Sequence, residues 1–265
     1  MSWWHALIVF AAGIWAGTIN AVVGSGTLVT FPVLVALGYP PVTATTSNAI
    51  GLAPGTVSGA IGYRHELKGQ ARRLVRYSVP SFAGAICGTV LLLSLPHNTF
   101  ELVVPVLVAL ALVLVLIQPR VSTFVARRRD PQPETEAMVR TTTRSVSVEG
   151  GPLLLFLIFL IGVYGGYFTA AQGVMMVGVM GMMVTDSLQR LNGIKNVLAA
   201  VVNVVAGTVY AFVAPVSWPV IGLLAVGSTL GGQVGAKIGR RLPPTVLRGV
   251  IVVVGGAAIV QLLLR

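Results

Sequence analysis

The stretch that decides the fold is residues 13–32, GIWAGTINAVVGSGTLVTFP, followed closely by residues 44–56, ATTSNAIGLAPGT. Both are mostly apolar, but Gly, Asn, Ser, Thr and Pro interrupt them in clusters. A helix that only crosses a bilayer needs no such clusters, whereas a helix that breaks inside the membrane to expose its backbone to a solute does. A diverged copy of the pattern returns at residues 162–210, so the remaining sequence is interpreted as scaffold around two copies.

Composition assigns the chain to a broad class. Of its 265 residues 55% are hydrophobic and 9% are charged, whereas soluble proteins carry about 25% charged residues. Long apolar runs separated by short polar loops predict an all-α polytopic membrane protein, and they do not alternate as the strands of a membrane β-barrel would. The net charge of +11 comes from basic residues in loops. The positive-inside rule explains this pattern, and we expect no nucleic-acid partner.

Ten apolar segments are predicted, five in each half of the chain. They cover residues 4–23, 26–37, 45–63, 74–95, 100–118, 152–171, 173–184, 192–213, 218–236 and 249–264. Segments 26–37 and 173–184 are too short to cross about 30 Å of hydrocarbon, so they are expected to be broken or re-entrant helices. We therefore predict a first transmembrane repeat over residues 1–118, a disordered cytoplasmic linker over 119–151 and a second repeat over 152–265.

The two halves match each other residue by residue at nearly constant offsets. The pairs at an offset of 149 are Gly13/Gly162, Gly17/Gly166 and Gly24/Gly173, and those at an offset of 147 include Ser81/Ser228, Gly84/Gly231 and Gly88/Gly235. All of the 18 basic residues except Arg265 fall in residues 64–76, 119–151, 185–195 and 237–248. Placing these four regions in the cytoplasm makes the repeats inverted, and it leaves open whether the short segments cross or re-enter.

The parts of an enzyme or a metal site are missing. His5, His65 and His97 are far apart, Cys87 is the only cysteine, and the seven carboxylates fall in loops or at segment ends. No metalloprotease, nucleophile-elbow or P-loop motif occurs. The methionines of residues 175–183 are interpreted as flexible packing rather than as a copper site. We predict neither an enzyme nor a bound cofactor or metal.

The polar clusters at the breaks are the candidate binding site. The free N–H groups at the start of a half-helix, with neighbouring hydroxyls, suit an anion. The alternatives are close packing of small residues and, for residues 45–48, a helix cap. The candidate substrate-binding residues are Asn20, Gly24, Ser25, Gly26, Thr27, Thr46, Ser47, Asn48, Gln172, Gly173, Asn192, Lys195, Asn196 and Asn203.

Three of these residues, Asn192, Asn196 and Asn203, lie on one helical face, because they are spaced by 4 and 7 residues. Lys195 could attract an anion, or it could snorkel to the membrane interface. Asp186 is the single candidate for coupling transport to protons.

These motifs resemble those of the sulfite exporter TauE/SafE family. The resemblance rests on residues 13–32 and ATTSN, on LNGIKNVLAAVVN at 191–203, and on GGQVGAKIGRRLP at 231–243. It implies movement of sulfur-containing anions, such as sulfite, organosulfonates or thiosulfate, across the bacterial inner membrane. From the broken segments we expect alternating access around a central site, with export as the favoured direction. The second copy has QGVM at residues 172–175 where the first has VGSG at 23–26, so a symmetric site is in doubt. An anion channel and a membrane assembly factor that transports nothing are the alternatives, and the sequence leaves a homodimer open.

Overall fold

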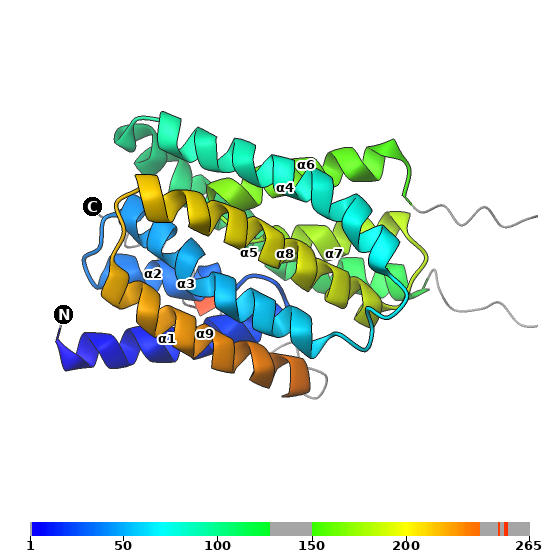
Figure 1. The fold of residues 1–265 in the computed structure, drawn as a ribbon, viewed down its shortest axis with the longest axis horizontal. Coiled ribbons are helices and arrows are strands. Elements are labelled where there is room, and N and C mark those ends of the chain that lie inside the picture. The colour runs from blue at the N-terminus through cyan, green and yellow to red at the C-terminus, as the bar shows by residue number, and fades with distance from the viewer. Residues whose placement is uncertain (1, 128–149, 239–248, 250–251, 254–265) are drawn as a thin grey trace, which may run out of the picture.

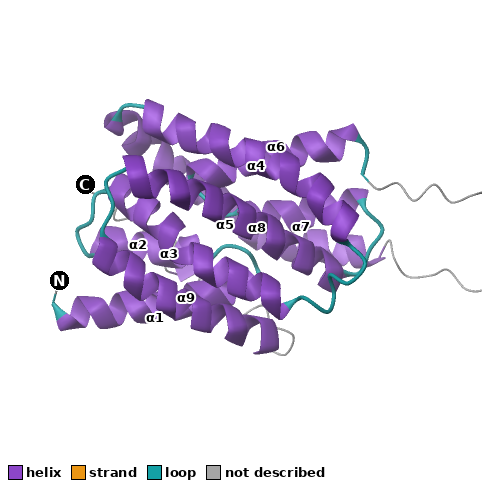
Figure 2. Cartoon of the chain, in the orientation of Figure 1, coloured by secondary structure: helices purple, strands orange, loops and turns teal. Residues whose placement is uncertain are grey.

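The computed structural model describes residues 2–127, 150–238, 249 and 252–253. Across residues 2–127 and 150–238 every regular element is an α-helix (Figures 1 and 2), which confirms the all-α prediction. Most of the predicted tenth segment, 249–264, and residues 128–149 of the predicted linker lie outside the described residues.

The helix bounds follow the predicted segments to within about four residues, except at the end of α5; α6 ends at Tyr167 rather than at residue 171, and α8 begins at Leu188 rather than at residue 192. Helix α3 begins at Pro41 rather than at residue 45, because proline is favoured in the first turn. Helix α5 continues to Arg127, so residues 119–127 of the predicted linker are helical. The helices are α1 (Trp3–Val22), α2 (Thr27–Ala36), α3 (Pro41–Gly62), α4 (Ala71–Ser94), α5 (His97–Arg127), α6 (Pro152–Tyr167), α7 (Gln172–Met183), α8 (Leu188–Val213) and α9 (Trp218–Ile238).

Several helices have the length and the composition of membrane spans. Within the described residues, α1, α4, α8 and α9 are long and apolar enough to cross a bilayer. Helices α2 and α7 have 10 and 12 residues, which makes them about 15 and 18 Å long. They are therefore shorter than the hydrocarbon core, as the sequence predicted.

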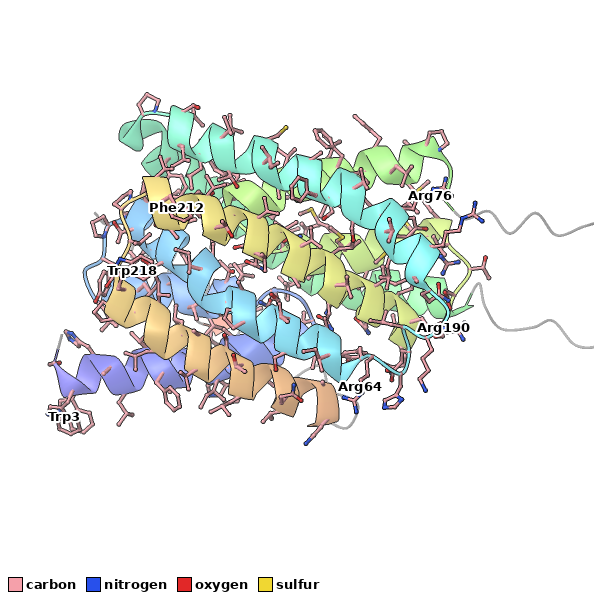
Figure 3. The ribbon with its side chains drawn as sticks, viewed as in Figure 1. Trp3, Arg64, Arg76, Arg190, Phe212 and Trp218 are labelled. Carbon is pink, nitrogen blue, oxygen red and sulfur yellow. The ribbon has the colours of Figure 1, made fainter. Side chains whose placement is uncertain are left out.

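The bundle has two chemically different ends (Figure 3). Arg64, Arg76 and Arg190 lie at one end, which we call the basic end. Trp3 and Trp218 lie at the other, which we call the aromatic end. Positive charge at one side and aromatic rings at a boundary are both typical of proteins that sit in a bilayer.

The two short helices turn the chain back inside this bundle. Helix α6 begins and α7 ends at the basic end, because Arg76 donates to the Gly150 carbonyl at 3.4 Å and Arg73 pairs with Asp186. Helix α1 begins at the aromatic end, and α2 leads back to α3, whose first turns bond to the connection between α8 and α9. The hairpins α1–α2 and α6–α7 therefore enter the bundle from opposite ends.

Small residues let the long helices pack against these hairpins. Helix α1 packs along α9, and α4 packs along α6. A Cβ on Gly17 would lie 2.2 Å from the Ser228 carbonyl oxygen, and one on Gly88 would lie 2.0 Å from that of Val163. Such contacts are impossible for any larger residue, so these two crossings require glycine and hold the hairpins close to the long helices.

Candidate functional site

The tips of the two hairpins meet inside the bundle. The Gly173 N–H donates to the Gly24 carbonyl at 3.1 Å. Gly24 has a φ of +92°, and a Cβ on Gly173 would lie 2.5 Å from the Gly24 Cα. Both positions therefore need glycine, one for its backbone conformation and both for the close approach. We call this contact the junction; it joins two glycines that the sequence matched at an offset of 149.

Side chains of the first break hold the α1–α2 tip in shape. The Asn20 Oδ1 accepts a hydrogen bond from the Gly26 N–H at 2.8 Å, which closes the turn between the two helices. The Asn48 Nδ2 donates to Thr27 Oγ1 at 3.0 Å, and its Oδ1 accepts from Thr30. Asn48 therefore ties α3 to the first turn of α2, which explains why a polar residue lies inside an otherwise apolar helix.

A further hydroxyl pair links the first break to the second. Thr27 and Thr169 share a hydrogen bond of 3.1 Å between their Oγ1 atoms. Thr169 lies in the connection between α6 and α7 and has a φ of +60°, which is rare for a β-branched residue. Polar contacts therefore join the two hairpins at Thr27 and Thr169 as well as at the glycines.

Lys195 places a cation beside the junction. Its side chain is fully buried, and its Nζ donates to the carbonyls of Asn20 at 3.0 Å and Ala21 at 3.2 Å. Asn196 also donates to the Ala21 carbonyl, at 3.2 Å. These carbonyls belong to the last turn of α1, where the helix dipole favours a cation. Lys195 does not snorkel, and within the described residues no carboxylate forms an ion pair with it.

Two buried polar groups beside the junction donate to no other group in the described part of the chain. They are Ser25 Oγ and Gln172 Nε2. Ser25 directly follows Gly24, and Gln172 directly precedes Gly173. A buried donor without an acceptor costs free energy. These groups therefore have unused hydrogen-bonding capacity at the place where the two hairpins meet.

Thr46 and Ser47 belong to the aromatic end rather than to the junction. The Thr46 hydroxyl donates to the Pro215 carbonyl at 2.7 Å, and the Ser47 Oγ accepts from the Ser217 N–H at 2.9 Å. Because α3 begins at Pro41, residues 45–48 are not its cap. These two side chains instead bind α3 to the connection between α8 and α9.

The predicted asparagine stripe of α8 is distributed over different surroundings. Asn196 reaches the junction through Ala21, whereas Asn192 is half-buried one turn earlier. Asn203 donates to the Ala199 carbonyl of its own helix at 3.0 Å, and it lines a groove between α3, α8 and α9. Of the three, Asn196 is the one in hydrogen-bond contact with the hairpin tips.

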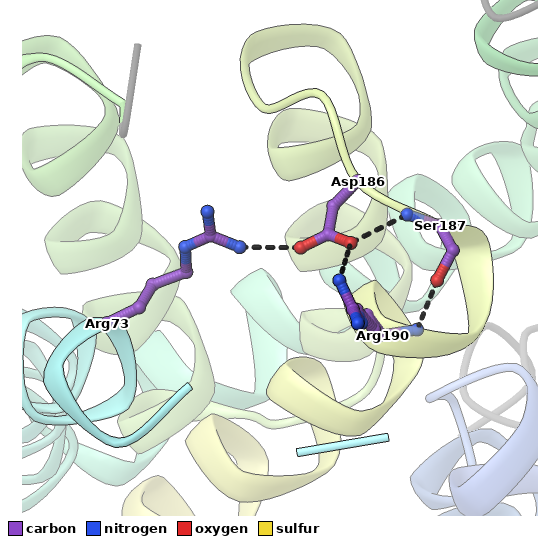
Figure 4. A network of polar contacts seen from close by, with 4 residues as sticks. All are labelled: Arg73, Asp186, Ser187 and Arg190. Atoms are coloured by element: carbon purple, nitrogen blue, oxygen red, sulfur yellow. Dashed lines mark hydrogen bonds and ion pairs between the residues drawn. The ribbon is translucent and has the colours of Figure 1, made fainter. Parts of the chain in front are cut away.

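Asp186 takes part in an ion-pair network at the basic end (Figure 4). Its Oδ2 lies 2.6 Å from Arg73 Nη1, and its Oδ1 lies 3.5 Å from Arg190 Nη1. The Ser187 N–H donates to the same carboxylate at 2.8 Å, and the Ser187 hydroxyl caps α8. The carboxylate therefore joins α4 to the connection between α7 and α8, at a distance from the junction set by the length of α7.

The sequence did not identify Thr30 as a site residue. The available signal was its spacing, because Thr30 lies three residues after Thr27 on α2 and therefore on the same helical face. In the described part of the chain no three His, Cys, Asp or Glu side chains gather as a metal site would require. Met176 and Met180 pack in a buried apolar cluster with Leu191 and Ile194.

Comparison with known proteins gives one family and several distant relatives. The family model described as sulfite exporter TauE/SafE matches residues 9–262. A Sinorhizobium protein named "Probable membrane transporter protein ORF9" is 26% identical over 96% of this chain and 91% of its own length. An Escherichia coli protein named "Probable membrane transporter protein YfcA" is 22% identical over 97% of this chain and 88% of its own length. A Haemophilus influenzae protein named "Probable membrane transporter protein" is 22% identical over 93% of this chain and 89% of its own length. No solved structure matches.

Proposed function

Because the chain belongs to the sulfite exporter TauE/SafE family of membrane transporters, we propose that it moves a small sulfur-containing anion, sulfite or an organosulfonate, across the bacterial inner membrane. The observation that carries this proposal is the chemistry of the junction. Unpartnered donors and a buried lysine gather there, and no carboxylate in the described residues pairs with that lysine. An anion gains from such a site, whereas a cation finds no acidic ligand in it.

Two sets of residues have different roles in this proposal. Ser25 and Gln172 donate directly to the oxygens of the anion, because their donors have no protein acceptor in the described residues. Asn20, Asn48, Thr27, Gly24 and Gly173 hold the hairpin tips in position, because their polar groups already have partners. The first turn of α2 adds the positive end of its dipole, but not the free N–H groups that the sequence predicted, because those of Gly26, Leu28 and Val29 already have acceptors. Lys195 supplies positive potential from α8.

We propose alternating access around this junction as the mechanism. The opposed hairpins are what inverted repeats would produce. The matched glycines support a duplication, because Gly17 of α1 approaches Ser228 of α9 and Gly166 of α6 approaches Ala85 of α4. The two halves are held together by Arg73 and Asp186 at the basic end and by Thr46 and Pro215 at the aromatic end. Breaking these contacts in turn would open one side at a time.

The positive-inside rule assigns the basic end to the cytoplasm. Outward movement of an anion is then favoured by the membrane potential, by about 2.3 kcal/mol per charge at 100 mV. Asp186, the candidate for proton coupling, is already engaged by Arg73 and Arg190. We therefore propose that transport is driven by the potential and by the anion gradient.

The test is anion flux in proteoliposomes made with the purified protein. Sulfite, methanesulfonate and thiosulfate are offered separately, with Ser25→Ala compared against Thr56→Ala. Thr56 is a matched control because its buried hydroxyl donates within its own helix, to Ala53 at 2.8 Å. We expect wild-type flux of at least one of these anions and a reduced apparent affinity in Ser25→Ala alone. Flux of none of them would refute the substrate class, and single-channel currents would indicate a channel instead of a carrier.

A further inference from the structure

We propose that the Lys195 ammonium is a tethered cation, which occupies the place that a free monovalent cation would take at the broken helix α1. The inference goes one step further than the proposed function and rests on it where transport is concerned. It predicts that anion transport needs no sodium ion, because the positive charge that stabilises the end of α1 is covalently attached to α8. It also predicts that removing the lysine side chain creates a binding site for a small cation.

The lysine ammonium is bound by oxygens of the kind that ligate cations. Its Nζ lies 3.0 Å from the Asn20 carbonyl oxygen and 3.2 Å from that of Ala21. Both carbonyls are at the end of α1, where the chain leaves the helix before Gly24. Carbonyl oxygens at the ends of broken membrane helices are the usual ligands of coupling cations in transporters. In this chain the ligands are already satisfied by an ammonium group.

The electrostatic balance favours this role over an ion pair. The described residues offer Lys195 no carboxylate, so the charge is stabilised by the two carbonyls and by the negative end of the α1 dipole. These are partial charges, so net positive potential remains at the junction for the substrate anion. The Lys195 side chain also approaches Gly24, since its Cδ would lie 3.3 Å from a Cβ at that position.

The lysine also connects two elements that alternating access would move relative to each other. Lys195 belongs to α8 of the second half, and its acceptors belong to α1 of the first half. Asn196, the next residue, donates to the same Ala21 carbonyl at 3.2 Å. In the described part of the chain, the side chains that donate to the Asn20 and Ala21 carbonyls both belong to α8. The lysine therefore ties the position of α8 to that of the α1–α2 hairpin.

The first test is thermal unfolding of the purified protein, which needs no substrate. Lys195→Ala removes the ammonium and leaves space, whereas Lys195→Met removes the charge and fills the space. Each is measured with chloride salts of choline, sodium and methylammonium. We expect sodium or methylammonium to raise the melting temperature of Lys195→Ala by about 3 °C or more relative to choline, with no such response in wild type or Lys195→Met. Equal melting temperatures of Lys195→Ala in all three salts would overturn the proposal.

The second test uses wild-type protein and therefore does not depend on the folding of a variant. Flux of the transported anion is compared in sodium and in choline media. We expect rates that agree within about twofold, and a strict sodium requirement would overturn the tethered-cation proposal. Absence of wild-type flux in both media would instead refute the proposed function, while the unfolding experiment would still decide whether a cation site exists.

Discussion

Replacing Gly173 by alanine perturbs the junction with a single methyl group. A Cβ at this position would lie 2.5 Å from the Gly24 Cα and 2.8 Å from the Gly24 carbonyl oxygen. Both neighbours are backbone atoms, so no side chain can rotate away to relieve the contact. The hairpin tips must separate, and the hydrogen bond from the Gly173 N–H to Gly24, 3.1 Å long, must lengthen.

The size of the effect follows from three contributions. Alanine favours a helix over glycine by about 1 kcal/mol, and Gly173 lies in the first turn of α7, so this contribution stabilises the variant. Overpacking costs about 1–3 kcal/mol, and loss of a buried hydrogen bond costs about 0.5–1.5 kcal/mol. The net destabilisation is therefore about 1–3 kcal/mol, or a melting temperature lower by roughly 2–10 °C.

The assay is thermal unfolding in detergent, followed by anion flux in proteoliposomes. Gly222→Ala is the matched control, because Gly222 is an exposed residue of α9 and a Cβ there would meet no atom within 4 Å. We expect this control to be as stable as wild type or slightly more stable, with normal flux. If Gly173→Ala unfolded at the same temperature as Gly222→Ala and transported normally, the close contact between the hairpin tips would be refuted.

Three further predictions concern polar contacts outside the glycine pair. Asn48→Ala removes the bonds to Thr27 and Thr30 and should lower the unfolding free energy by about 1–3 kcal/mol; unchanged thermal unfolding would contradict this. Asp186→Asn weakens the contact with Arg73 and should lower the unfolding free energy by about 1–3 kcal/mol, while anion flux continues. A stable variant without anion flux would support proton coupling instead. Thr46→Val removes the hydroxyl that donates to Pro215 and should lower the unfolding free energy by about 0.5–1.5 kcal/mol. The apparent affinity for the anion should not change, and a large change in that affinity would assign Thr46 to the site.

The sequence was sufficient to predict the helical segments and the two breaks. Runs of apolar residues determine the membrane-length helices, and clusters of Gly, Asn and Ser indicate where a membrane helix is interrupted. The internal match paired Gly24 with Gly173 as counterparts in the two repeats, but their contact at the junction is known only from the structure. These features are local or periodic, so they can be read from one chain without its contacts.

The partners of the polar residues could not be predicted in the same way. Lys195 and the carbonyls that it binds are about 175 residues apart, and no local pattern states which helix end a lysine will reach. The asparagine stripe was misleading for a similar reason, because Asn196 and Asn203 are separated by about 10 Å along the helix axis. They share a face of α8 but meet different neighbours, Ala21 for Asn196 and the groove beside α3 for Asn203.

The most direct test of the account is the sulfite-evoked current across proteoliposomes containing wild type or the double variant Ser25→Ala, Gln172→Leu. Both substitutions remove donors that have no protein acceptor in the described residues, and thermal unfolding of the variant is measured alongside the current to establish that it is folded. We expect wild-type current to rise with sulfite concentration and saturate, and the double variant to need about tenfold more sulfite for the same current. Identical current curves for the two proteins, or no current and no flux in wild type, would contradict an electrogenic anion site at the junction.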